Sequence, residues 1–160
     1  MVDLAAAAVT ALNAGSFSQA FTAVRKYQPR WKRDELANLR VTVVPRGDDR
    51  DGTASGGARN EYQEDLVFEV GVQKQYDATN DVTELATCDA LAYLFEEVKD
   101  FLGLTSGAAR RFQLDSGDHY CWIRTENVNP DHFWVEAHQQ DLHVFTAVAR
   151  FFYRGFQESS

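Results

Sequence analysis

The chain has 160 residues, of which 44% are hydrophobic and 12% aromatic, and its formal net charge is −8 at pH 7. This length and apolar content predict a single folded domain, residues 1–160, with its own hydrophobic core. The negative charge argues against a general nucleic-acid-binding surface, because such a surface needs basic side chains to neutralise phosphates.

Neither a leader nor a membrane span is expected. Residues 1–15 lack the basic start of a signal peptide, and no apolar run approaches the ~20 residues that a spanning helix needs. Cys88 and Cys121 are the two cysteines of the chain, too few for a disulfide framework, and we interpret both as reduced structural residues. We therefore expect a soluble protein that is made in a cytoplasm.

The N-terminal segment predicts a short helix followed by a strand. Residues 2–15 are rich in alanine and lie between Asp3, a candidate N-cap, and Gly15, a residue typical of a helix end. Alternating apolar and polar side chains then predict a strand over residues 21–27. One or two helical turns are expected in residues 32–39.

A second strand and a long loop follow. Residues 40–47 are rich in β-branched side chains, and we expect this strand to stop at Pro45, which cannot donate a ladder hydrogen bond. Residues 47–58 hold four glycines, three aspartates and no large apolar side chain. Such a composition predicts a flexible loop at about residues 46–60, into which the flanking strands extend as a hairpin arm.

The clearest pattern of the chain lies in residues 59–76, which alternate with a period of two. That period predicts a half-buried strand, because successive side chains point to opposite faces of a sheet. We expect it to be the central antiparallel strand. One face would carry Leu66, Phe68, Val70 and Val72, and the other Glu64, Val67, Glu69, Gly71 and Gln73.

Residues 77–104 predict the longest helix. Asn80 or Thr79 is a candidate N-cap, and Gly103 is expected to end the helix. A buried stripe is predicted by residues at the spacing i, i+3, i+4 and i+7, namely Leu91, Leu94, Phe95, Val98, Phe101 and Leu102.

The C-terminal third predicts two further strands. Residues 105–119 are interpreted as a connection, residues 120–128 as a strand, and the segment after Asn129 as a turn and a short helix. Residues 142–156 carry apolar side chains on both faces, which predicts a central or doubly covered strand. The fold class is therefore α+β, a mostly antiparallel sheet with the long helix and the short N-terminal helix packed on one face.

Residues able to perform chemistry do not form a recognisable motif. The four histidines are His119, His132, His138 and His143, without C-x-x-C or H-x-x-x-H spacing for zinc. His119 and Cys121 share a strand face but have no orienting third group for nucleophilic catalysis. We expect no enzyme, metal or cofactor. A small metal- or ligand-binding enzyme that uses residues 119–132 is the alternative from another class.

The order of the segments carries a resemblance to a known family. The run VTALNAGSFSQAFTAVRKYQPRWKRDELANLRVTVVPRG, the strand DLVFEVGVQKQYD and the terminal strand HVFTAVARFFYRGF resemble the tail-terminator and related neck proteins of tailed bacteriophages. The similarity spans nearly the whole chain, but nothing in the loop of residues 47–58 identifies a particular docking partner, and the segment 105–119 matches no known part of such proteins.

The resemblance implies a structural virion protein at the head–tail junction. It would form a ring, usually a hexamer, that terminates the tail tube and joins it to the head connector, after assembly in the host bacterial cytoplasm. DNA would pass through the lumen without specific binding, which suits an acidic chain. A head–tail connector or stopper ring is the alternative within the virion, and a monomeric adaptor is a further one. No membrane partner is expected.

The resemblance also places candidate contacts, because the flexible loop of such proteins commonly reaches a neighbouring ring or lines the lumen. We expect contacts between rings or with the lumen from Asp48, Asp49, Arg50 and Asp51. Arg110 and Arg111 are expected to pair with acidic residues of the neighbouring subunit across the ring seam.

Overall fold

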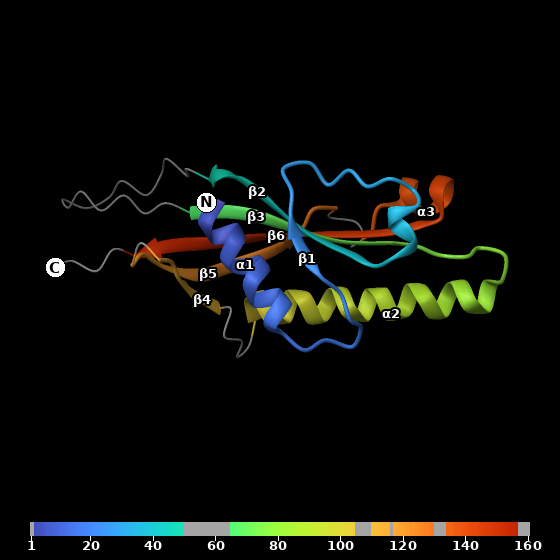
Figure 1. The fold of residues 1–160 in the computed structure, drawn as a ribbon, viewed down its shortest axis with the longest axis horizontal. Helices are drawn as coiled ribbons and strands as arrows, with labels where there is room; N and C mark the ends of the chain where they lie inside the picture. The colour runs from blue at the N-terminus through green and yellow to red at the C-terminus, as the bar shows by residue number, and fades with distance from the viewer. Residues whose placement is uncertain (1, 50–64, 105–109, 116, 130–133, 157–160) are drawn as a thin grey trace.

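The structure, a computed structural model, describes residues 2–49, 65–104, 110–115, 117–129 and 134–156. They form one six-stranded sheet in the order β1-β2-β3-β6-β5-β4, with α1 and α2 on one face (Figure 1). The predicted α+β class is confirmed. The elements are α1 (Val2–Ala14), β1 (Ala23–Arg25), the 3-10 turn η1 (Glu35–Ala37), β2 (Arg40–Asp49), β3 (Asp65–Gln75), α2 (Asp81–Lys99), the π-helical turn η2 (Asp100–Leu104), β4 (Arg111–Gln113), β5 (His119–Asn127), α3 (Glu136–Leu142) and β6 (Val144–Phe156).

The first helix is attached to the edge of the sheet by a side chain. Asn13 donates from Nδ2 to the Ala23 carbonyl (3.1 Å) and accepts the Ala23 N–H at Oδ1 (2.7 Å), so it takes the place of a strand neighbour for β1. Asp3 lies within the first turn of α1 and is not its cap, contrary to the prediction. The expected end is confirmed, since the Gly15 N–H donates to the Leu12 carbonyl.

Strand β2 continues through Pro45 and reaches Asp49, so the prediction that it ends at the proline is wrong. The reason lies in the pairing: β1 runs parallel to β2 and pairs only with residues 41–43. At Pro45 the described chain therefore places a ladder partner only on the β3 side, and the missing N–H is tolerated at such an edge. The register shifts between Pro45 and Asp48.

The two long central strands confirm the predicted core face, but the expectation of a half-buried strand is wrong, because residues 65–72 of β3 are buried on both faces. β3 pairs antiparallel with β2 and β6, and its side chains at 66, 68, 70 and 72 enter the core as expected. β6 is covered on the same face by helices. The largest fully buried side chains include Phe68, Phe95, Phe151 and Tyr153, and the Phe68 ring stacks between those of Phe151 and Tyr153.

Helix α2 begins as predicted at Asn80, whose Oδ1 accepts the N–H groups of Val82 (3.0 Å) and Thr83 (3.3 Å). Its core stripe is buried apart from Phe101, which is half-buried. The helical path continues past Gly103 as the η2 turn. There the Tyr153 hydroxyl donates to the Leu102 carbonyl, and burial raises the pKa of that phenol.

The C-terminal third contains one strand that the sequence did not predict, the three-residue β4 at the sheet edge beside β5. The predicted strand and short helix correspond to β5 and α3. After α3, His143 adopts φ 51°, and the chain turns directly into β6. In the part of the chain that the structure describes, no helix is long and apolar enough to span a membrane.

Candidate functional site

Among the residues that the structure describes, contacts over the face of the sheet opposite α1 and α2 lie at one end. There the segment between β1 and β2 contributes Trp31, whose indole N–H donates to Thr42 Oγ1 (3.2 Å) under the Lys26 ammonium. From α3, His138 Nδ1 lies 3.0 Å from Thr146 Oγ1, which also accepts from Gln73. These contacts cover the end of the sheet at which β2 begins.

At the other end of the same face, a carboxylate is held between two arginines. Arg46 approaches one oxygen of Glu69 with Nε (2.7 Å) and Nη2 (2.6 Å), and Arg150 donates to the other oxygen from Nε (3.1 Å) and Nη2 (2.8 Å). Glu69 is 4% exposed, whereas both arginine side chains are half-exposed. A buried carboxylate needs such charge-assisted hydrogen bonds to offset the loss of water. The pair of arginines thereby presents guanidinium groups at the surface in fixed positions.

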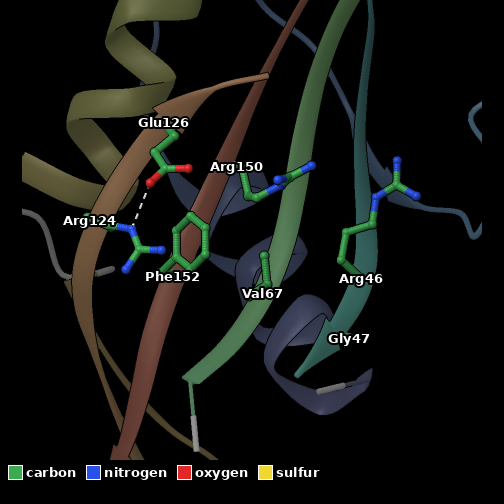
Figure 2. A pocket seen from close by; sticks show the side chains of 7 residues that line it. All are labelled: Arg46, Gly47, Val67, Arg124, Glu126, Arg150 and Phe152. Atoms are coloured by element: carbon green, nitrogen blue, oxygen red, sulfur yellow. Dashed lines mark hydrogen bonds and ion pairs between the residues drawn. The ribbon is translucent and has the colours of Figure 1, made fainter. Parts of the chain in front are cut away.

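Beside this triad the sheet face is hollowed, as Figure 2 shows, with the helices lying behind the sheet. We call this open depression of about 490 Å³ the arginine hollow, defined by its lining residues Arg46, Gly47, Val67, Arg124, Glu126, Arg150 and Phe152. Val67 and Phe152 are paired across β3 and β6 and form its apolar floor.

The far wall of the arginine hollow comes from β5. The Arg124 guanidinium lies 3.7 Å from the centre of the Phe152 ring and donates from Nε to Glu126 (2.8 Å). A cation over an aromatic face is held electrostatically, and its aliphatic stem covers the ring below. The hollow and the Glu69 that supports it therefore hold three arginines and two glutamates, a local excess of positive charge on a chain of −8.

A bidentate ion pair joins β3 and β6 next to the hollow. Arg154 donates to both oxygens of Asp65, from Nε (2.7 Å) and Nη2 (2.9 Å), and this raises the pKa of the guanidinium. The pair joins β6 to the first residue of β3 directly opposite. It orders this end of the sheet face beside the arginine hollow.

A second unusual surface lies on α2, on the side of the helix that points away from the core. The first ten residues of the helix, 81–90, include no buried side chain. Val82, Leu85 and Tyr93 are nevertheless large and apolar, and they are 79%, 64% and 63% exposed. With Asp89 between them, they follow one helical line at spacings of three and four residues. We call Val82, Leu85, Asp89 and Tyr93 the α2 stripe.

The residues that the sequence proposed as contacts do not meet. The backbones of Asp48 and Asp49 pair with Leu66 and Asp65 at the end of β2, and their side chains, with residues 50 and 51, lie outside the described part. Arg110 and Arg111 are exposed at β4, on the opposite edge of the sheet, where the Arg110 guanidinium approaches the Trp122 ring (5.8 Å). Three strands, β3, β6 and β5, separate the two groups.

Sequence reasoning missed both surfaces. The alternation placed Glu69 on the face opposite Leu66, Phe68, Val70 and Val72, but it gave residues 142–156 no polar face, and only the register shows that Glu69 and Arg150 are paired. For the α2 stripe the signal was present as apolar residues outside the predicted core stripe.

The histidines and cysteines are dispersed. Among the residues that the structure describes, no three His, Cys, Asp or Glu side chains are grouped to hold a metal ion. His132 lies outside the described residues. Burial, with Glu84 and Asp89 nearby, raises the pKa of the Cys88 thiol, which disfavours the reactive thiolate.

The fold and its surfaces define a class: a single-sheet α+β domain with helices on one face, an arginine-lined hollow on the other, and an exposed apolar helix stripe. Comparison with models of protein families, with curated proteins and with solved structures finds no match to this chain.

Proposed function

We propose that this protein is a structural subunit of a ring at the head–tail junction of a tailed bacteriophage, a tail terminator that closes the tail tube and joins it to the head connector. The proposal starts from the segment order that resembles tail-terminator and neck proteins. It assigns no catalytic role to the chain, and its partners are further copies of itself, the tail tube and the connector.

The observation that supports this proposal best is the α2 stripe. An isolated helical segment of ten residues is marginal in water, and most helical stability in proteins comes from packing of an apolar face. Residues 81–90 of α2 include no fully buried side chain, and Val82, Leu85 and, just beyond this half, Tyr93 are exposed to solvent. Aligned exposed apolar side chains of this kind usually mark an interaction site. A subunit of an assembly would cover them.

The test is to add the purified protein separately to tail tubes and to isolated head connectors, and to image both by electron microscopy. We expect a ring-shaped cap at one end of each tube. Caps on connectors but not on tubes would instead support a stopper ring. Binding to neither would contradict the proposal.

A further inference from the structure

We propose that the α2 stripe of one copy docks into the arginine hollow of the next copy, so that identical subunits associate head to tail. This inference rests on the proposed ring and specifies the contact between neighbouring subunits, which we call the seam. Both surfaces lie on described, ordered elements: the stripe on α2, and the hollow on β2, β3, β5 and β6.

Charge complementarity favours a second copy as the occupant of the hollow. Helix α2 carries five carboxylates against one lysine, and Lys99 is already paired with Glu96 (2.7 Å). Asp89 lies on the stripe itself, between Leu85 and Tyr93, and is exposed. The hollow offers three half-exposed guanidinium groups around an apolar floor that is itself largely covered, since Val67 and Phe152 are 6% and 3% exposed. An acidic, apolar helix face therefore matches a basic hollow with an apolar floor.

The arginines are prepared for a second acceptor. Each guanidinium has five N–H donors in a planar fork, and Arg46 and Arg150 each direct Nε and Nη2 at Glu69. Glu69 thus fixes both side chains before a partner arrives, which lowers the entropy lost on binding. Tyr93 adds an aromatic ring of the kind that guanidinium groups favour.

The two surfaces cannot meet within one chain. The hollow is on the sheet face opposite α2, as Figure 2 shows, and in Figure 1 the start of α2 lies at the other end of the long axis from the end of β2. A two-fold dimer would pair the two surfaces reciprocally, which requires both to lie on the same side of the subunit. Here they lie on opposite sides, so the contact is heterologous, and it produces a closed ring when the rotation closes. The placement of the surfaces thus agrees with a ring rather than with a two-fold dimer.

Two substitutions test the seam, one on each surface: Leu85→Asp on the stripe and Arg124→Glu on the hollow. Their matched controls make the same chemical change elsewhere, Leu142→Asp on the exposed end of α3 and Arg33→Glu before η1. The mass of each purified full-length variant is measured by size-exclusion chromatography with light scattering, and circular dichroism checks folding. We expect each seam variant to lose the ring and each control to retain it.

Mixing the two seam variants gives the decisive result. The Leu85→Asp copy keeps an intact hollow, and the Arg124→Glu copy keeps an intact stripe. The two copies can therefore form one stripe–hollow contact, and the substituted surfaces at the ends of this pair cannot bind a third copy. We therefore expect a 1:1 dimer from the mixture and monomers from each variant alone. Dimers formed by the Arg124→Glu variant alone would show stripe-to-stripe pairing and overturn the inference.

The remaining outcomes separate this inference from the proposed function. If both seam variants still form rings of the wild-type mass, the proposed seam is wrong, while the proposal of a ring is unaffected. If Arg124→Glu retains the ring but loses nucleic-acid binding, the hollow binds phosphates rather than the α2 stripe, and the proposed seam is again wrong. A wild type that stays monomeric both alone and with tail tubes contradicts both proposals. If the seam variants lose the ring as predicted but wild-type rings never cap tubes, the seam is supported and the terminator function is contradicted.

Discussion

Gly103 lies where the end of α2 approaches β5, and there is no room for a larger residue. A Cβ atom at this position would lie 2.9 Å from Trp122 Nε1 and 3.0 Å from Thr125 Oγ1. These two atoms are themselves joined by a hydrogen bond of 2.9 Å, so neither is displaced without cost. We expect Gly103→Ala to lower the free energy of unfolding by about 1–3 kcal/mol, the usual range for overpacking. Denaturant unfolding followed by circular dichroism measures it.

Gly47 provides the matched control, since a Cβ built there meets nothing within 4 Å. We expect Gly47→Ala to change the unfolding free energy by less than about 0.5 kcal/mol, as for most surface substitutions. Similar losses at both positions would mean that steric contact with Trp122 is not the cause.

At the scale of elements, the first half of α2 depends on its cap because none of its side chains is fully buried. The Asn80 carboxamide oxygen accepts the N–H groups of Val82 and Thr83. We expect Asn80→Ala to destabilise this half of the helix by about 1 kcal/mol, the typical effect of losing such a cap. Amide hydrogen exchange of residues 81–90 should become faster, while Asn80→Asp should retain most of the protection. Unchanged exchange in Asn80→Ala would contradict the role of the cap.

Much of the fold could be predicted from the sequence wherever one residue pattern decides the structure. The period of two in β3 identified its core face, and the helical spacing from Leu91 to Leu102 identified the buried side of α2. Strand β2 was predicted too short because Pro45 forbids only a ladder bond on one side, and the short β1 leaves that side open. β4 was missed because three residues contain no detectable period.

The candidate surfaces depend on information that the sequence pattern does not contain. The hollow joins residues from four strands, and a shift of register by one residue would turn Glu69 or Arg150 to the core face. The register irregularities in β2 and β5 also help to decide which arginines share the face. The α2 stripe does leave a signal in the sequence, because Val82, Leu85 and Tyr93 are apolar residues outside the predicted core stripe.

At the scale of the whole molecule, the two faces of the sheet have different surroundings. One face packs against α1 and α2 and forms the core, whose buried members run from Leu4 to Tyr153. Within the described ranges, the other face is covered near η1 and α3, and its remaining part holds the arginine hollow. A domain that leaves an ordered polar face and an apolar helix stripe in solvent has two different surfaces available for copies of itself. We therefore propose that copies of this chain use these two surfaces to form a ring.

Native mass spectrometry of the purified wild-type protein, alone and after incubation with tail tubes, tests that claim most directly. We expect one closed assembly of fixed copy number, six being the number that the resemblance implies, either alone or once tubes are present. A monomer under both conditions would contradict the account.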